Sequence, residues 1–304
     1  MSEIMIEVSR FRKLYGDFVA VDDVSFDVRR GEIFGLLGPN GAGKTSTLEC
    51  LEGLRTPNGG TLRVGDVDPA VAPLRLRNLI GVQLQSGGLP ASITPDEAMR
   101  LFCAYHDVAP RYDLLERLGL REKRGVEFQE LSTGMQRRLA LALAVAHEPP
   151  VLFLDEPTAG LDVASRVELH TLMREYKGKG TTIMLATHDM AEAEELSDRV
   201  AILLKGQLVA VDTPLAITAT GAGLTKVSVN TRSGSLLDDK VNIPAVSQHM
   251  VKEAYAIFFS TDIGQTVSAI INSVEREGDT LLDLRVERPS LEDRFLELTD
   301  GGKS

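Results

Sequence analysis

A glycine-rich segment, Gly38-Pro39-Asn40-Gly41-Ala42-Gly43-Lys44-Thr45, has the residue types and the spacing that bind phosphate. It follows the apolar run Ile33–Leu37 and precedes a helical pattern, so it fits GxxxxGK[ST] in the required strand–loop–helix context. Glycines let backbone N–H groups wrap around phosphate oxygens, and the helix N-terminus adds the positive end of its dipole. We expect Lys44 to reach the β and γ phosphates of a nucleotide and Thr45 to ligate Mg²⁺. A glycine-rich turn with an incidental lysine is the alternative, and the flanking strand and helix argue against it.

Two adjacent carboxylates, Asp155 and Glu156, follow a second apolar run, Val151–Leu154. A buried strand that ends in two acids predicts that Asp155 holds the Mg²⁺ shell and that Glu156 polarises the attacking water as general base. An acidic cap before a helix is the structural alternative, which the phosphate-binding segment makes less attractive. These two motifs together fit many ATPases and GTPases.

A third segment separates these enzyme classes. Leu131-Ser132-Thr133-Gly134-Met135-Gln136-Arg137-Arg138-Leu139 lies upstream of the two acids and closely resembles the LSGGQ signature. The residues Asp155-Glu156-Pro157-Thr158-Ala159-Gly160-Leu161-Asp162 resemble a Walker B motif followed by a D-loop. On these motifs the chain resembles the ATP-binding subunits of ABC transporters.

The resemblance implies further site residues. His188 matches the switch histidine, Gln85 the Q-loop glutamine, and Tyr15 the aromatic residue that stacks on adenine, although Gln83 lies in the same strand as Gln85. The resemblance assigns catalysis to Glu156, His188 and Lys44. ATP would contact Tyr15, the segment from Gly38 to Thr45 and Ser46, while Mg²⁺ would be held by Thr45, Gln85 and Asp155.

The resemblance also implies a head-to-tail dimer, in which ATP bound to one chain is completed by Ser132, Thr133, Gly134 and Met135 of the other, with Asp162 in the D-loop. ATP would join the two chains and hydrolysis would release them. Thr133 replaces the first signature glycine and Met135 replaces the final glutamine, so these contacts could be weaker or rearranged. Both carboxylates and the histidine are present, which argues against an inactive site.

The elements that must position these residues alternate short apolar runs with helical stretches, as in an α/β fold. We expect a P-loop NTPase of the ABC ATPase type over residues 1–218, with a mixed sheet and a helical subdomain inserted at about 90–147. Strands are expected at Ile6–Phe11, Val24–Val28 and Thr182–Ala186. A hairpin of Val200–Leu204 and Gln207–Val211 is expected to turn at Lys205-Gly206.

The composition changes after a stretch read as a linker, Ile217–Lys226, and residues 219–304 are expected to form a small α+β accessory domain. The expected strands are Lys226–Asn230, Ala256–Phe259 and Thr280–Val286, and the expected helices are Gly264–Glu277 and Ser290–Leu298, the last capped by Ser290. The C-terminal segment Arg288–Leu298 resembles the PSLEDxFLxLT ending of ATP-binding subunits that serve ABC-2 type permeases, including daunorubicin-resistance-like exporters.

The bulk composition limits the possible partners. The 304 residues include 33 basic and 44 acidic residues, and this net charge of -11 argues against nucleic-acid binding. Cys50 and Cys103 are too few for a disulfide framework. There is neither a signal peptide nor an apolar run of the length that spans a bilayer. We expect a cytoplasmic chain, peripheral on the inner face of the membrane through an integral-membrane permease.

Three other functions remain open. An importer ATPase would share the motifs, but the C-terminal segment argues against it. A non-transport ABC protein would carry two ATPase domains or long coiled coils, which this sequence lacks. A catalytically silent binding module would not need Glu156 and His188.

Overall fold

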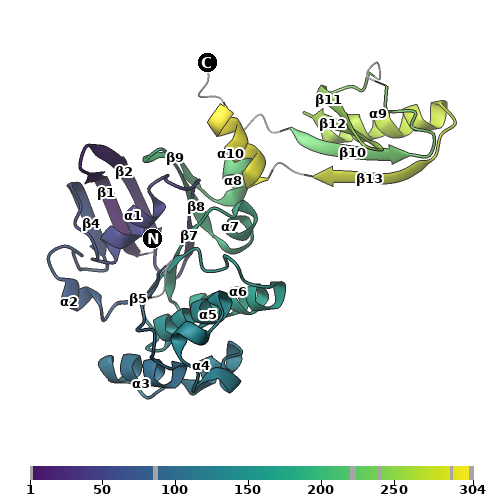
Figure 1. Ribbon diagram of the computed structural model, residues 1–304. Coiled ribbons are helices and arrows are strands. Elements are labelled where there is room, and N and C mark those ends of the chain that lie inside the picture. Colours follow the sequence, from purple (N-terminus) through teal and green to yellow (C-terminus); the bar gives the residue numbers. More distant parts are fainter. Residues whose placement is uncertain (1–2, 85–87, 220–223, 239–241, 288–289, 301–304) are drawn as a thin grey trace. The chain divides into compact units, whose positions relative to one another are not determined.

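The computed structural model describes residues 3–84, 88–219, 224–238, 242–287 and 290–300. The chain divides into two compact units, Met1–Pro214 and Leu215–Ser304. The phosphate-binding segment, both carboxylates and the histidine all lie in the first unit. Figure 1 shows the elements of each unit.

A six-stranded sheet forms the centre of the first unit, with the order β5-β6-β7-β3-β8-β9. The first five strands are parallel and β9 runs antiparallel to β8, so the expected mixed sheet is confirmed. The strands are β3 (Ile33–Leu37), β5 (Ile80–Gln83), β6 (Val151–Asp155), β7 (Thr182–Thr187), β8 (Arg199–Leu204) and β9 (Gln207–Asp212). The hairpin of β8 and β9 turns at Lys205 and Gly206, both with positive φ, as a two-residue hairpin loop requires.

The central strands are buried on both faces, which explains their uninterrupted apolar runs. Alternate side chains point to opposite faces. In β6, Val151 and Phe153 pack into one core cluster, whereas Leu152 and Leu154 pack into the other. The carboxyl ends of β3, β6 and β7 therefore stand at the same edge of a rigid layer, where the candidate site residues follow.

A second sheet, with the order β2-β1-β4, packs through its apolar residues into the same core cluster as helix α1 (Lys44–Leu51). Its long strands β1 (Ile4–Tyr15) and β2 (Phe18–Arg29) extend well beyond the expected ranges. Arg10 and Asp23 adopt positive φ at irregular points of the ladder, so the alternation that marks a strand is interrupted there. The sequence did not suggest β4 (Gly59–Val64), an edge strand, nor the short helix α2 (Pro73–Leu76).

The stretch between β5 and β6 is helical, as expected, and Figure 1 shows α3, α4 and α5 grouped together. Thr94 and Glu97 form a reciprocal capping box at the start of α3. Cys103, on α3, is buried and free, as is Cys50 on α1. The helices are α3 (Pro95–Tyr105), α4 (Tyr112–Arg117), two 3₁₀ turns (Arg121–Lys123 and Phe128–Glu130) and α5 (Thr133–Val145), followed beyond β6 by α6 (Val163–Gly178) and beyond β7 by α7 (Met190–Leu196).

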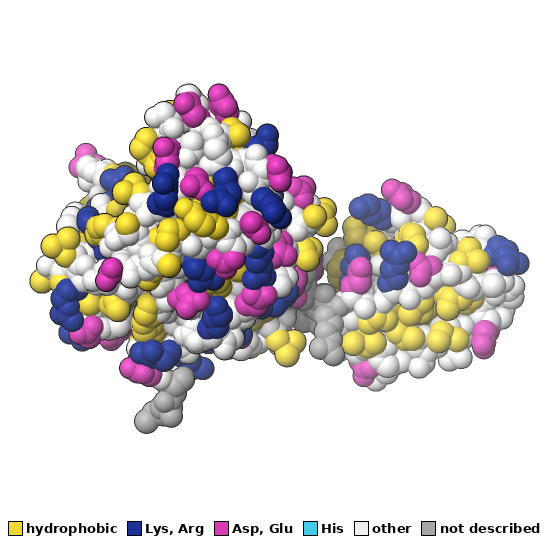
Figure 2. Space-filling model, turned by 90° about the horizontal axis from the view of Figure 1, so that it is seen from below, with side chains coloured by type: hydrophobic (Ala, Val, Ile, Leu, Met, Phe, Trp, Pro, Cys, Tyr) yellow, Lys and Arg dark blue, Asp and Glu magenta, His cyan; other side chains and the backbone are white. Residues whose placement is uncertain are grey.

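The second unit contains a four-stranded antiparallel sheet with the order β11-β12-β10-β13, and helix α9 packs on it. The expected linker is partly wrong, because its first residues belong to helix α8 and its last two begin β10; the sequence also missed strand β11. Hydrophobic side chains gather on the face of this unit seen in Figure 2. The elements are α8 (Pro214–Ala219), β10 (Thr225–Thr231), β11 (Val246–Lys252), β12 (Tyr255–Ser260), α9 (Ile263–Arg276), β13 (Leu281–Glu287) and α10 (Leu291–Asp300).

Ser290 caps the start of helix α10, as expected: its hydroxyl accepts the N–H of Asp293 at 3.1 Å, and its backbone N–H donates to the Asp293 carboxylate at 2.9 Å. This reciprocal arrangement satisfies two backbone donors at the helix start. Of the helices that the structure describes, none has the length and apolar content required to cross a bilayer.

Candidate nucleotide site

The phosphate-binding segment leaves β3 and turns into α1 through backbone conformations that favour glycine. Gly41 and Gly43 have φ of 81° and 103°. A Cβ on Gly43 would lie 2.7 Å from the carbonyl oxygen of Ala20, closer than atoms pack. The loop is therefore a glycine-dependent turn that ends at a helix N-terminus, the arrangement that binds phosphate oxygens.

Lys44 is the first residue of α1 and is 5% exposed. Its Nζ donates to the carbonyl of Gly38 at 2.7 Å and lies 3.8 Å from Oε1 of Glu156. Burial lowers the pKa of Lys44, while the negative charges of Glu156 and Asp155 oppose that shift. The ammonium group is thus held beneath the loop, next to Asp155 and Glu156, the two acids that the sequence motifs predict at this site.

Asp155 ends β6 beside the first turn of α1. The hydroxyl of Thr45 donates to Oδ2 of Asp155 at 2.9 Å, whereas the buried Oδ1 has no hydrogen-bond partner among the described residues. Burial is the largest cause that raises the pKa of Asp155. A carboxylate oxygen and a hydroxyl held together, with one further buried acceptor free, are hard oxygen ligands of the kind that Mg²⁺ takes. The donor set therefore fits a nucleotide-bound magnesium ion.

Glu156 and His188 meet at the carboxyl ends of two adjacent strands. Oε2 of Glu156 lies 2.7 Å from Nδ1 of His188. Glu156 is 6% exposed, whereas the side chain of His188 is 57% exposed, so the pair runs from the interior to the surface. Glu156 also adopts a φ of 50°, a left-handed conformation that is uncommon for residues with a Cβ. The backbone thus turns this carboxylate away from the strand and toward Lys44 and His188.

Tyr15 ends β1 and lies beside the phosphate-binding loop. Its hydroxyl and that of Ser46 are 3.2 Å apart, and its ring centre lies 5.1 Å from Nζ of Lys13 and 5.3 Å from Cζ of Arg55. The ring is partly exposed, and a base could stack on it without rearrangement of the core. The structure therefore brings Tyr15 and Ser46 together next to the loop.

The signature residues start helix α5. Ser132 is the N-cap, and its hydroxyl accepts the N–H of Met135 at 3.3 Å. Ser132 and Thr133 are exposed, and among the described residues no hydrogen bond or ion pair joins the signature to the loop of Gly38–Thr45. The N-terminus of α5 therefore faces solvent, where it can receive an anion from outside the chain.

The D-loop connects Glu156 to helix α6 beside the signature. A Cβ on Gly134 would lie 3.5 Å from a methyl carbon of Leu161, so the D-loop leaves room there for little more than glycine. Asp162 caps α6, where its carboxylate accepts the N–H of Ser165 at 2.9 Å. This contact and the Ser165 hydroxyl lower the pKa of Asp162.

The Q-loop glutamine, Gln85, lies outside the described residues, so its predicted role stays a prediction. Gln83, the alternative, is the last residue of β5; it is 1% exposed, and its Oε1 lacks a hydrogen-bond partner within the described residues. Leu84 is the last described residue before the segment that contains Gln85.

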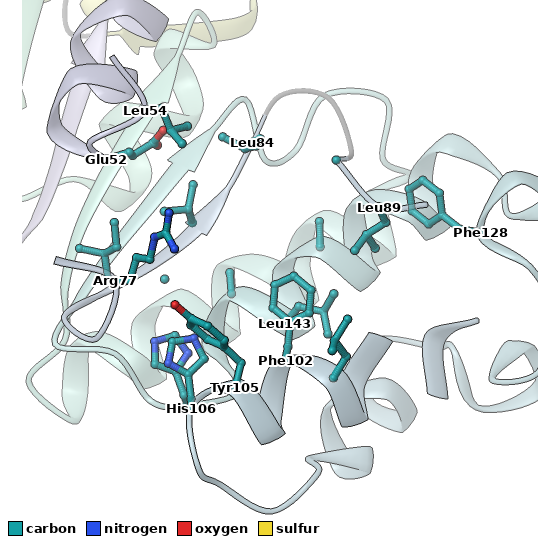
Figure 3. Close-up of a pocket in the computed structure, with 18 residues that line it drawn as sticks. Glu52, Leu54, Arg77, Leu84, Leu89, Phe102, Tyr105, His106, Phe128 and Leu143 are labelled. Atoms are coloured by element: carbon teal, nitrogen blue, oxygen red, sulfur yellow. The ribbon is translucent and has the colours of Figure 1, made fainter. Parts of the chain in front are cut away.

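A cavity of 570 Å³ is lined in part by Leu84 and Gly88 (Figure 3). Its lining is mostly apolar, with Glu52, Leu54 and Leu84 on one side and Phe102, Tyr105 and His106 on the other. Glu52, which the sequence analysis missed, is 6% exposed and neither carboxylate oxygen has a hydrogen-bond partner in the described part of the chain. The sequence feature that could have predicted its burial is the position of an acid in an otherwise apolar stretch, Cys50-Leu51-Glu52-Gly53-Leu54.

Comparisons with known proteins agree with this geometry. Residues 21–159 match the family model described as ABC transporter. The chain is 36% identical to a Nod factor export ATP-binding protein I from Paraburkholderia xenovorans, over 98% of both chains. It is 32% identical to the daunorubicin resistance ATP-binding protein DrrA3 from Streptomyces coeruleorubidus, over 98% of this chain and 97% of that one.

Solved structures resemble about 70% of the chain. The structure described as an ATP binding subunit of an ABC transporter aligns with a TM-score of 0.68 at 29% identity, over 72% of this chain and 93% of its own. A dimeric bacterial ABC transporter cassette, MJ0796, aligns with a TM-score of 0.64 at 24% identity and supports the fold. The fold class expected from the sequence is confirmed.

Proposed function

The chain belongs to the family of ABC transporter ATP-binding subunits and is an ATPase, and we propose that it powers export through a separate ABC-2 type permease. The observation that carries this proposal is the convergence of Lys44, Asp155, Glu156 and His188 at one edge of the sheet. The exporter assignment is supported by relatives named for export or drug resistance, which align over almost the whole chain, including the second unit.

The loop of Gly38–Thr45 and Ser46 would bind the phosphates of ATP, and Tyr15 would stack on the adenine. Thr45, Asp155 and Gln85 would hold Mg²⁺, which neutralises phosphate charge when it is bound. Lys44, already beneath the loop, would add a positive charge near the β and γ phosphates. The buried free oxygen of Asp155 supports this placement because it is an acceptor without a partner in the described chain.

Glu156 would act as the general base that orients and polarises the attacking water. His188, 2.7 Å from its carboxylate, would hold that carboxylate in place and contact the γ-phosphate. Because His188 is largely exposed, its ring can reach the γ-phosphate from the surface. Because Glu156 is buried, its carboxylate stays fixed by the surrounding residues.

Two chains would associate head to tail around two ATP molecules. The exposed N-terminus of α5, with Ser132 as its cap, supplies the N–H groups and the dipole that would face the γ-phosphate bound to the other chain. Thr133, Gly134 and Met135 would line that contact, and Asp162 would stand next to it at the start of α6. Hydrolysis breaks the bond between the β and γ phosphates, and departure of the cleaved phosphate would remove the group that both chains bind and release the dimer.

The permease would dock near the Q-loop, and the chain would then lie at the inner face of the membrane. The cavity beside Leu84 supports this, because it lies between β5, which leads to Gln85, and the helices α3 and α5. A partner segment seated there would sense the segment that contains Gln85. The substrate, a drug, antibiotic, lipid or polysaccharide, would be bound by the permease and not by this chain.

The test compares ATP hydrolysis and size-exclusion chromatography for the wild type and Glu156→Gln. The wild type should hydrolyse ATP, and Glu156→Gln should lose turnover by about a hundredfold or more while it elutes as a dimer in ATP. The exposed Glu122→Gln serves as the matched control and should behave as the wild type. Near-normal hydrolysis by Glu156→Gln would remove Glu156 from the role of general base.

A further inference from the structure

Arg137 lies on α5, five residues after the N-cap Ser132, and its guanidinium reaches across to the strand end that carries Glu156. Its Nη1 donates to the carbonyl oxygen of Glu156 at 3.1 Å and also to the carbonyl oxygen of Ala159. Among the described residues Arg137 forms no ion pair, and its guanidinium binds backbone carbonyls instead. The contact therefore depends on where the backbone of Glu156–Ala159 lies.

That backbone is held in an unusual conformation. Glu156 has a φ of 50°, and residues other than glycine keep such a conformation only where surrounding contacts impose it. On the strand side, the N–H of Glu156 donates to the carbonyl of Ala186 at 2.9 Å. On the other side, Arg137 binds its carbonyl. The two contacts hold both ends of the same residue.

Arg137 also belongs to the rigid first turns of the signature helix. Ser132 caps this helix, and a Cβ on Gly134 would lie 3.5 Å from Leu161 of the D-loop. A shift of the helix N-terminus, of the kind that an incoming phosphate would cause, moves the guanidinium and with it the two carbonyls that it binds. The signature and the general base are thus connected through one side chain.

We propose that Arg137 is a positioning residue that couples the signature helix to the general base Glu156 of the same chain. This inference rests on the proposed function, in which the signature of a chain serves one ATP and Glu156 serves the other. Engagement of α5 by the partner's nucleotide would fix Arg137, and Arg137 would fix the backbone from which the base projects. Hydrolysis at one site would therefore depend on occupancy of the second.

The experiment measures kcat and KM for ATP hydrolysis by the wild type, Arg137→Ala, Arg137→Lys and the control Arg121→Gln. Arg121 lies in the same helical region and is exposed, with a long ion-pair distance of 3.8 Å to Glu116. Arg137→Ala should lower kcat about tenfold to a hundredfold with KM changed less than about threefold, since it acts on the base and not on ATP binding. Arg137→Lys should recover part of the rate, because an ammonium group can bind one of the two carbonyls.

A double variant separates positioning from a loss of stability. If Arg137 acts through Glu156, then Arg137→Ala in the Glu156→Gln background should not reduce the residual rate further, so the two effects are not additive. Unchanged kcat in Arg137→Ala, or additive effects, would overturn the proposal even when Glu156→Gln behaves as expected. A failure of the wild type to hydrolyse ATP would instead contradict the proposed function.

Discussion

The carboxylate of Glu156 lies between two basic groups, 2.7 Å from Nδ1 of His188 and 3.8 Å from Nζ of Lys44. Each of the three residues follows a different parallel strand of the six-stranded sheet: Glu156 follows β6, His188 follows β7 and Lys44 follows β3. Strands that are packed on both faces cannot shift independently, so the distance between the base and its two neighbours is set by the core. The sheet thus acts as the frame that keeps a carboxylate buried and oriented.

Replacement of His188 should therefore affect the rate more than binding. His188→Ala leaves Glu156 without its closest side-chain partner, and we expect kcat to fall by about a hundredfold with ATP binding retained. His188→Gln keeps an amide donor near the carboxylate, so its kcat should lie between those of the wild type and His188→Ala. The checks are steady-state hydrolysis and the direct binding of a fluorescent ATP analogue. Equal loss of binding and turnover would mean that His188 mainly holds the nucleotide.

The role of Tyr15 can be divided between its ring and its hydroxyl. Tyr15→Ala removes both and should raise the KM for ATP by about tenfold, because stacking of a base on an aromatic ring contributes roughly 1–3 kcal/mol. Tyr15→Phe keeps the ring but loses the 3.2 Å contact with Ser46, and it should stay close to the wild type. If Tyr15→Phe is as impaired as Tyr15→Ala, the hydroxyl contact matters and stacking does not.

Much of the frame could be predicted because it depends on local sequence. The strands β3, β6 and β7 are runs of apolar residues buried on both faces, and such runs are recognised without tertiary information. The loop of Gly38–Thr45 has a fixed pattern for the same reason, since its glycines are required by local backbone geometry. Edge strands such as β4 and β11 are half exposed and carry polar residues, so their patterns were too weak to be recognised.

Contacts between distant segments could not be predicted in this way. The bond from Arg137 to the carbonyl of Glu156 joins residues 19 positions apart through the packing of α5 against the D-loop. No sequence pattern near Arg137 predicts this hydrogen bond. The burial of Glu52 likewise follows from the meeting of α1, β5 and the helical region, which the sequence of its own helix does not contain.

Replacement of the exposed Thr133 by glycine tests whether its departure from the signature pattern weakens dimer formation. Thr133→Gly removes a branched side chain from the place where α5 would approach the phosphate of ATP bound to the other chain. The N-terminus of α5 should then contact that phosphate more closely. In the Glu156→Gln background, we expect dimers to form at a severalfold lower ATP concentration. Ser132→Ala removes the cap and should act in the opposite direction. Chromatography across an ATP titration measures both, and a Thr133→Gly curve that matches the parent would show that Thr133 is not an obstacle.

Glu52 should make the stability of the first unit depend on pH. Burial, followed by the nearby charges of Asp155 and Glu49, raises the pKa of Glu52 from 4.5 to about 8. Between these values the unfolded chain has lost the proton while the folded chain keeps it. The folded state then binds more protons, so the free energy of unfolding falls as pH rises, by up to about 1.4 kcal/mol per pH unit.

Glu52→Gln removes this penalty because its amide does not ionise. The variant should match the wild type near pH 5 and exceed its stability increasingly toward pH 8, as measured by urea unfolding at each pH. His147, whose pKa burial lowers to about 4, and His106 line the same cavity and shift stability in the opposite direction. Arg77 also lines the cavity and, like the two histidines, is present in both the wild type and Glu52→Gln. The difference between the two curves of stability against pH therefore reports on Glu52. The exposed Glu7→Gln should give no such difference, and parallel curves for Glu52→Gln and the wild type would show that Glu52 is ionised in the folded chain.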